Sequence, residues 1–220
     1  MTATELKERL RYFPRHEAGI LGRDKMFNAA VLIPFCEIDG ALHVVFEKRT
    51  QHIRQGGEIS FPGGAYDAHE NDAAVVATRE CSEELGLEEE KIHILGRMDS
   101  LVSPKKLIID ACIGWLDINS IKNLAYNKDE VETLFSLPFN FFVETKPHTY
   151  HTRFTIHSYK ENTDGTKEIL FPAKELGIPE VYHESWGETL HTIYVYETPY
   201  GPLWGFTAEF MVELVQNLQH

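Results

Sequence analysis

A helical pattern that begins shortly after a double glycine constrains this sequence more than any other feature. Helical periodicity runs from Asn71 to Gly86, and Gly63-Gly64 precedes it, after a predicted strand. Gly86 marks a natural end of the helix, because glycine adopts the left-handed conformation found after many helix C-termini. The double glycine permits positive φ angles and a close approach of the backbone to a ligand. The chain must therefore place a glycine-rich turn directly before a helix.

Glutamates gather on one flank of this helix. At about 100° per residue, Glu80, Glu83 and Glu84 fall within an arc of roughly 100°. A neighbouring flank faces a core and carries Ala74, Ala77, Cys81 and Leu85. Like charges at these spacings cost about 0.2–0.5 kcal/mol each, and the Arg79–Glu83 pair recovers a similar amount. An ordinary solvated glutamate face is therefore one interpretation. The other is a ligand ridge for a hard cation such as Mg²⁺, which prefers oxygen ligands.

The spacing around the helix resembles the motif of the Nudix hydrolases. In that motif a glycine is followed by five residues, a glutamate, seven residues, and an Arg-Glu-apolar-x-Glu-Glu-x-Gly-apolar run. Gly64, Glu70 and the Arg79–Leu87 run match it, but eight residues separate Glu70 from Arg79. The run from Arg79 onward matches fully. The additional residue leaves open whether Glu70 is in register.

Segments outside the motif resemble the coenzyme A pyrophosphatase branch of that family. Arg49, Thr50, Arg54 and Gly57 precede FPGG in a similar order, although Thr50 replaces the branch's Ser or Ala and one spacer is a residue shorter. The insertion before Arg79 is also similar to that branch. Further similar segments are NKDEVETLFSLP (127–138) and LWGFTAEF (203–210). Residues 160–190 have no counterpart, and we interpret them as an insertion that serves as a lid or an oligomer contact.

The resemblance implies a metal site on the helix. Its expected ligands are Glu80 and Glu84, with Glu83 close behind, and the backbone carbonyl of Gly64. The cofactor implied is Mg²⁺, with Mn²⁺ as the substitute. Arg79 is expected to orient a glutamate through a charge-assisted hydrogen bond. The alternative for Arg79 is a plain surface ion pair at i,i+4 spacing.

The resemblance also implies a general base and phosphate-binding groups. The base is not confined to one motif position, so Glu83 and Glu130 are both catalytic candidates, and a solvated loop glutamate is the alternative for Glu130. Arg49, Arg54 and Gly63 are the substrate-binding candidates, since arginine binds phosphate in a bidentate manner. Arg49 could equally pair with a surface carboxylate.

Strand and helix patterns alternate irregularly along the chain, which favours an α+β fold with a mixed β-sheet between helices over a doubly wound parallel sheet. We expect one Nudix domain over residues 1–220. Expected strands are 29–35, 41–48 (after an Asp39-Gly40 turn), 92–98, 107–116, 130–137, 152–159 and 192–197. Expected helices are 4–12, 71–86, 138–144 and 207–218, the last with Thr207 as its N-cap.

Composition excludes some partners. The net charge is −13, from 21 basic and 34 acidic side chains, which argues against a broad nucleic-acid-binding face. The three cysteines are far apart and lie in apolar segments, as expected for buried thiols in a reducing compartment. There is no apolar signal core and no run of about 18 apolar residues. We therefore expect a cytoplasmic protein that does not bind membranes, and leave a homodimer open.

Together these features predict an enzyme, a Mg²⁺-dependent hydrolase that cleaves the pyrophosphate of a nucleoside diphosphate linked to another group. The favoured substrate is coenzyme A or one of its derivatives. The alternatives are an ADP-ribose or dinucleoside-polyphosphate pyrophosphatase and a non-catalytic nucleotide-binding regulatory module.

Overall fold

The computed structural model describes residues 2–11 and 19–219. Its α-helices are α1 (Ala3–Arg11), α2 (Ala73–Leu85), α3 (Phe139–Glu144) and α4 (Gly205–Gln219), and its 3-10 helices are η1 (Arg23–Lys25), η2 (Glu89–Lys91) and η3 (Glu180–Tyr182). Its strands are β1 (Phe27–Ile38), β2 (Ala41–Arg49), β3 (Ile59–Ser60), β4 (Gly63–Ala65), β5 (Ile92–Arg97), β6 (Leu101–Ser103), β7 (Leu107–Leu116), β8 (Val131–Pro138), β9 (His148–Ile156), β10 (Tyr159–Glu161), β11 (Lys167–Ile169), β12 (Trp186–Thr198) and β13 (Gly201–Trp204).

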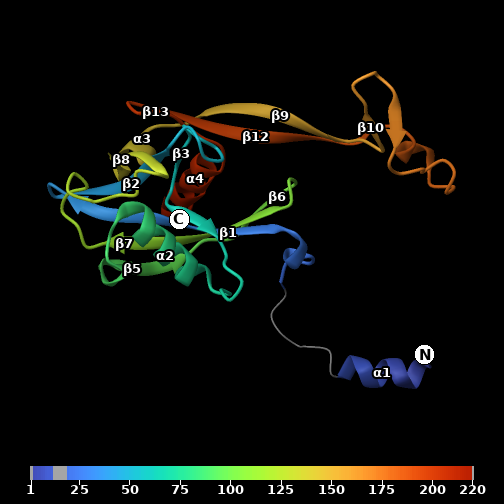
Figure 1. Ribbon diagram of the computed structural model, residues 1–220, viewed down its shortest axis with the longest axis horizontal. Coiled ribbons are helices and arrows are strands. Elements are labelled where there is room, and N and C mark those ends of the chain that lie inside the picture. Colours follow the sequence, from blue (N-terminus) through green and yellow to red (C-terminus); the bar gives the residue numbers. More distant parts are fainter. Residues whose placement is uncertain (1, 12–18, 220) are drawn as a thin grey trace.

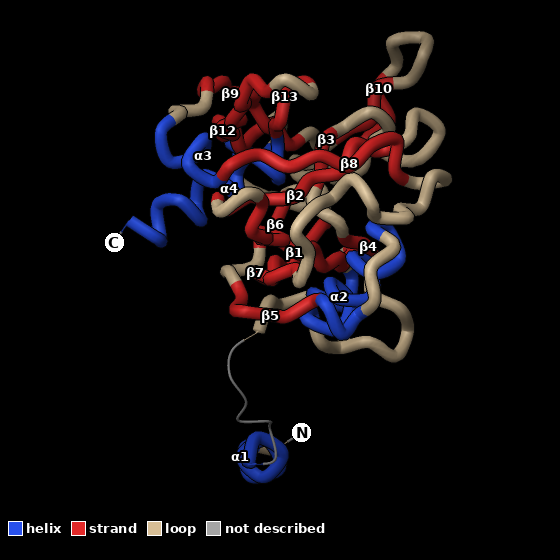
Figure 2. Tube along the Cα trace, turned by 90° about the vertical axis from the view of Figure 1, so that its left-hand side faces the viewer, coloured by secondary structure: helices blue, strands red, loops and turns tan. Residues whose placement is uncertain are grey.

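Strands β1 to β8 form one mixed sheet. Its central order is β3-β2-β1-β7-β5, with β4 on β1, β6 on β7 and β8 on β2. Strands β1 and β7 run parallel and the other pairs run antiparallel. Helix α2 covers one face of the sheet, and α3 and α4 cover the other (Figures 1 and 2). The predicted α+β fold, a mixed sheet between helices, is confirmed.

The predicted β1–β2 hairpin is present and is longer than expected. Asp39 and Gly40 both have positive φ angles, 52° and 77°, which is the geometry of a type I′ turn. Such a turn matches the twist of the strands that it joins. Ile38 therefore pairs directly with Ala41.

One edge of β1 changes partner along its length. The first half pairs with β4, ending at Val31 opposite Gly63, and the second half pairs with β2 from Phe35 onward. Pro34 lies at this change of partner, where its missing N–H costs no ladder hydrogen bond on that side. The far end of β2 is therefore not paired with β1, and Glu47 and Lys48 pair with β3 instead.

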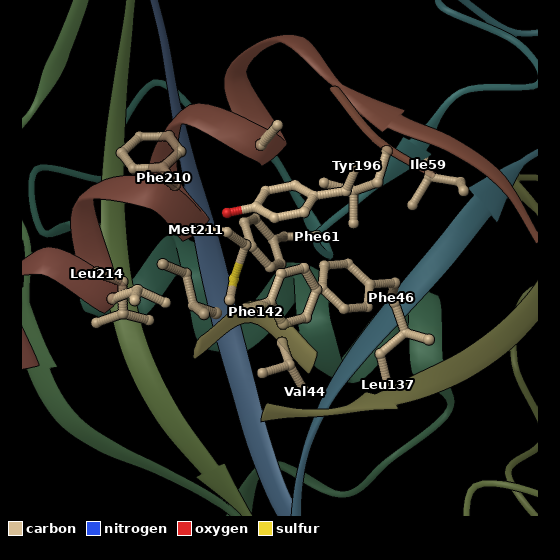
Figure 3. Packing of buried hydrophobic residues seen from close by; sticks show 14 of the residues in the cluster. Val44, Phe46, Ile59, Phe61, Leu137, Phe142, Tyr196, Phe210, Met211 and Leu214 are labelled. Carbon is tan, nitrogen blue, oxygen red and sulfur yellow. The ribbon is translucent and has the colours of Figure 1, made fainter. Parts of the chain in front are cut away.

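The apolar core on the α4 face holds the FPGG segment in place. Phe61 is buried and stacks on Phe46, with ring centroids 5.2 Å apart (Figure 3). Phe46 also stacks on Phe135 of β8. The two glycines follow Phe61 within three residues, so the core fixes where they lie.

Some local predictions need correction. Helix α4 begins at Gly205, so Thr207 is not its N-cap; its hydroxyl instead donates to the Ile59 carbonyl at 3.3 Å. Helix α2 begins at Ala73 rather than Asn71, because Asp72 caps it. The predicted buried, free state of all three cysteines is confirmed.

The unmatched segment extends from the rest of the molecule. Strands β9 and β12 form a long antiparallel ribbon, extended at its base by β13, and the hairpin β10–β11 lies at its far end (Figure 1). The predicted insertion at 160–190 forms this end and the adjoining part of β12. Helix α1 covers the predicted 4–12 helix except for Tyr12, which lies outside the described residues. None of the helices in residues 2–11 and 19–219 is long and apolar enough to span a membrane.

Candidate active site

Helix α2 is fixed at both ends by its own sequence. The Asp72 side chain accepts a hydrogen bond from the Ala74 N–H at 2.8 Å, which caps the N-terminus. At the other end, Gly86 has a φ angle of 63°, and a Cβ there would lie 2.2 Å from the Ala125 carbonyl oxygen. Only glycine satisfies both demands. The 125–131 loop is therefore held against the end of α2, where Asn127 N–H also donates to the Glu84 carbonyl at 2.9 Å.

Arg79 holds the motif carboxylates together. Its Nε and Nη2 donate to the two carboxylate oxygens of Glu70, at 2.9 and 3.0 Å. Its Nη1 donates to Glu80 at 2.8 Å and to Glu83 at 3.3 Å. Glu70 therefore contacts Arg79 despite the additional residue before Arg79. A bidentate arginine contact of this kind is strong and directional.

The two glycines lie directly against the glutamates of α2. A Cβ on Gly64 would lie 2.3 Å from Glu80 Oε1, so a side chain at that position would displace the carboxylate. The Gly63 N–H donates to Glu84 Oε2 at 2.8 Å. The structure therefore brings together Gly63, Gly64, Glu80 and Glu84, all of which the sequence predicted.

Glu84 does not fit the interpretation of a solvated glutamate face, because it is 2% exposed. Burial raises the pKa of Glu84 well above the ordinary value, and the negative charge of Glu47 raises it further, while the Gly63 N–H and Arg49 oppose the shift. Glu80 is partly buried, and burial likewise raises its pKa against the opposing effect of Arg79. Two carboxyl groups whose negative charge is poorly solvated are suited to binding a cation.

Arg49 bridges two buried carboxylates. Its Nη1 lies 3.1 Å from Glu47 Oε1 and 3.6 Å from Glu84 Oε1. It therefore belongs to the site, and its present partners are carboxylates. The surface ion pair considered as an alternative is not what the structure shows, because Glu47 and Glu84 are both buried.

Glu47 is a site residue that the sequence analysis missed. It lies on β2, two residues from Val45, whose side chain packs on the core beneath α2. Because strand side chains alternate between faces, Val45, Glu47 and Arg49 point to the same side. A glutamate within an apolar strand could have marked Glu47 as a candidate. The sequence pattern does not show, however, that the face of β2 carrying Glu47 lies against α2.

Two catalytic candidates lie at the edge of the cluster. The Glu83 side chain is 59% exposed, and its contact with Arg79 is the i,i+4 pair expected from the sequence. Glu130 lies close enough for its charge to raise the pKa of Glu80. Its carbonyl accepts a hydrogen bond from Thr50 N–H at 2.8 Å, which ties its loop to the end of β2 beside Arg49.

Arg54 is placed differently from the other candidates. Its guanidinium lies over the ring of Phe27, 5.4 Å from the centroid. Its carbonyl accepts a long hydrogen bond from Arg49 Nε, at 3.4 Å. Within residues 2–11 and 19–219 no ion pair joins Arg54 to the glutamates, so its predicted role depends on substrate reaching it.

The donor set fits a divalent cation with oxygen ligands. Carboxylates outnumber the two guanidinium groups in the cluster, and Glu47 Oε2 is buried without a hydrogen-bond donor. In the part of the chain that the structure describes, no three acidic, His or Cys side chains already form a metal-binding group. Guanidinium groups lie between the carboxylates: Arg49 contacts two of them and Arg79 contacts three. Glu80, Glu84 and the Gly64 carbonyl are the groups that could hold Mg²⁺ or Mn²⁺.

Comparisons with known proteins place this cluster in context. The family profile described as the NUDIX domain matches residues 26–110. The mitochondrial coenzyme A diphosphatase NUDT8 of Homo sapiens is 32% identical over 61% of this chain and 61% of its own length. Nudix hydrolase 3 of Caenorhabditis elegans is 30% identical over 66% of this chain and 63% of its own. The peroxisomal coenzyme A diphosphatase NUDT7 of Mus musculus is 30% identical over 69% and 60%. The matched part of the chain thus spans about three fifths of each of these relatives.

Proposed function

The chain belongs to the Nudix family, with its Nudix domain at residues 26–110, and from that premise we propose that it hydrolyses the pyrophosphate bond of a nucleoside diphosphate linked to another group. One observation carries the proposal. Arg79 binds Glu70, Glu80 and Glu83 at once, beside Gly64 and the buried Glu84. Burial disfavours the charged forms of Glu80 and Glu84, which raises their pKa values and favours binding of a cation between them.

Each residue of the cluster has a proposed role that follows from its position. Glu80, Glu84 and the Gly64 carbonyl hold the cation, for which Mg²⁺ is proposed and Mn²⁺ is the substitute. A divalent cation there supplies Lewis-acid chemistry, which neutralises phosphate oxygens and favours deprotonation of water. Arg79 orients Glu80 and Glu83, and Glu70 in turn fixes the plane of the Arg79 guanidinium. The Gly63 N–H holds the Glu84 carboxylate in place.

The chemical step is attack of water on one phosphorus atom. The new P–O bond forms as the bridging P–O bond breaks, and the products are a nucleoside monophosphate and a phosphorylated remainder. The proton of the water passes to a carboxylate, for which Glu83 and Glu130 are the candidates because both lie close enough for their charges to raise the pKa of Glu80. Arg49 and Arg54 are proposed to bind phosphate oxygens of the substrate.

Coenzyme A or one of its derivatives is the proposed substrate. This choice is supported by the resemblance of the segments around Arg49–Gly57 and 203–210 to the coenzyme A pyrophosphatase branch. Two of the relatives above are named as coenzyme A diphosphatases. Nucleic acid and membranes are not proposed partners, and a homodimer and a cytoplasmic location stay predictions.

A substrate panel with Mg²⁺ tests the proposal. The panel contains coenzyme A, acyl derivatives, ADP-ribose, NADH and diadenosine polyphosphates, with product formation measured by chromatography. We expect coenzyme A or an acyl derivative to be hydrolysed fastest, and Glu84→Gln to lower kcat/KM at least about 100-fold. Unchanged turnover in Glu84→Gln would disprove the metal assignment. Absence of turnover with every panel member would favour a nucleotide-binding regulatory module.

A further inference from the structure

Glu47 is a fully buried carboxylate whose two oxygens are treated differently by the protein. Its side chain is 0% exposed. Oε1 accepts hydrogen bonds from Ser60 Oγ at 3.0 Å and from Arg49 Nη1 at 3.1 Å. Oε2 is buried and has no donor. A buried carboxylate oxygen without a partner is strongly unfavourable, so it calls for a missing partner.

The groups around Oε2 indicate what that partner is. Glu84 carries the second buried carboxylate of this cluster, 2% exposed and next to the same guanidinium group. Arg49, the cation beside the pair, is already shared between Glu47 Oε1 and Glu84 Oε1. One guanidinium group therefore serves two carboxylates, so it cannot neutralise both negative charges. A cation with oxygen ligands matches this environment better than an additional hydrogen-bond donor.

A purely structural role would explain only half of these contacts. If Glu47 served only to anchor Arg49, its Oε1 bonds to Arg49 and Ser60 would be sufficient. Oε2, buried without a donor, would then be destabilising with no compensating interaction. A glutamine at this position would keep the Oε1 contacts and remove that cost.

We propose that Glu47 supplies a further ligand oxygen, Oε2, to the divalent cation held by Glu84. The inference rests on the proposed function, because it assumes that the cation binds at Glu84. It adds a ligand from β2 to a site otherwise built from α2 and the FPGG segment. Arg49 would then compete with the cation for the same two carboxylates.

Direct Mn²⁺ binding tests the inference without any activity measurement. Mn²⁺ is titrated into the wild type and variants, and free Mn²⁺ is measured by electron paramagnetic resonance. We expect Glu47→Gln to weaken Mn²⁺ binding about tenfold or more, as the loss of a metal-supporting group does. Glu132→Gln is the matched control: Glu132 lies on the neighbouring β8, is exposed and pairs with Lys48, so it should bind Mn²⁺ like the wild type.

A second variant separates a ligand from an anchor. Arg49→Gln removes the competing guanidinium, so Mn²⁺ should bind at least as tightly as in the wild type. If Arg49→Gln weakens binding as much as Glu47→Gln does, Glu47 acts through Arg49 and the inference is overturned. If Glu47→Gln does not fold, as judged by circular dichroism, Glu47→Asp takes its place and must weaken Mn²⁺ binding by a similar factor.

The test also separates the two proposals. If Glu84→Gln weakens Mn²⁺ binding while Glu47→Gln matches the wild type, the Glu47 inference is wrong and the proposed metal site stands. If the wild type and Glu84→Gln bind Mn²⁺ equally, or neither binds it, the metal site of the proposed function is wrong and the Glu47 inference falls with it.

Discussion

At the scale of single residues, the shape of the Arg79 guanidinium matters more than its charge. It donates to both oxygens of Glu70 and to Glu80 at the same time. Lysine has a point charge and cannot reproduce this planar fork. We expect Arg79→Lys to lower kcat/KM by about 10–100-fold, an effect of the size seen for groups that orient metal ligands.

The matched control for that prediction is Arg97→Lys. Like Arg79, Arg97 pairs with a carboxylate, in this case that of Asp72, but its side chain is exposed. Its replacement should leave kcat/KM within about twofold, since exposed ion pairs contribute little. Equal losses in both variants would show that Arg79 acts through general electrostatics rather than through its geometry.

The buried Glu84 predicts how stability depends on pH when no metal is present. Burial, then the charges of Glu47 and Glu80, raise the pKa of Glu84, and Gly63 N–H and Arg49 only partly offset this. A folded-state pKa above the unfolded value contributes stability that is complete below about pH 4.5 and is lost as pH rises through the raised pKa. Glu84→Gln carries no such loss.

Urea denaturation in EDTA at about pH 5 and about pH 8 measures this difference. We expect Glu84→Gln to be more stable than the wild type, and the advantage to be larger at the higher pH. An advantage that does not change with pH would mean that Glu84 does not titrate in this window.

The sequence predicts those contacts of the site that join residues close together in the chain, and not those that join distant segments. Arg79, Glu80, Glu83 and Glu84 lie within two turns of one helix, so their mutual positions follow from helical geometry. The register of Glu70 depends on the path of the loop between Gly64 and Asp72, which spacing alone does not determine. Glu47 and Arg49 come from a strand whose facing direction depends on the whole sheet.

At the scale of elements, Gly86 determines how α2 ends and where the next loop lies. Alanine there would adopt a left-handed conformation, at about 1–2 kcal/mol, and its Cβ would meet the Ala125 carbonyl oxygen. We expect Gly86→Ala to lower the free energy of unfolding by about 2–4 kcal/mol, because both strain and overpacking contribute. Urea denaturation measures the change.

Gly205→Ala serves as the control for conformation alone. Gly205 has a φ angle of 64°, close to that of Gly86, but nothing lies within 4 Å of the Cβ that it would gain. The expected loss is about 1–2 kcal/mol. If the two variants lose the same free energy, the close approach of Ala125 does not contribute.

Element predictions from the sequence were accurate where one periodicity dominates a segment. The β1–β2 hairpin and α2 have apolar faces that mark their limits. The β9–β12 ribbon was predicted only in part, at 152–159 and 192–197. Its side chains are exposed over most of its length, so no hydrophobic alternation marks where the strands begin. Short strands such as β3 and β4 exist because neighbouring strands pair with them, which no local pattern encodes.

At the scale of the whole molecule, the proposed function requires an acidic protein to bind an anionic substrate. The chain carries a net charge of −13, so its overall field repels phosphate groups. The arginines near FPGG and a bound cation would supply positive charge only where it is needed. This arrangement would make affinity for the proposed substrate depend on metal, and the net charge disfavours broad binding of polyanions.

The insertion at the end of the β9–β12 ribbon forms its contacts within itself. Hydrogen bonds there join residues of the same segment, such as Leu170 and Phe171 to the Ser158 carbonyl and Ser185 to His157. Trp186 packs against Tyr182 and Phe171 in a small aromatic cluster of its own. The apolar cores on the two faces of the main sheet are built from other parts of the chain.

We therefore predict that replacing residues 158–184 with a two-residue Asn-Gly turn leaves the Nudix fold intact. The deletion variant should melt cooperatively, within about 5 °C of the full chain, since little core surface is lost. It should also retain stabilisation by Mn²⁺, because Glu80 and Glu84 lie in α2. Calorimetry with and without Mn²⁺ measures both the melting temperature and the stabilisation by Mn²⁺.

Replacing the β1–β2 turn residues Asp39-Gly40 with Ala-Ala is the contrasting variant. It disturbs the main sheet and should melt at a lower temperature. Loss of cooperative melting in the deletion variant would mean that the insertion is part of the folding unit, and would support one indivisible domain.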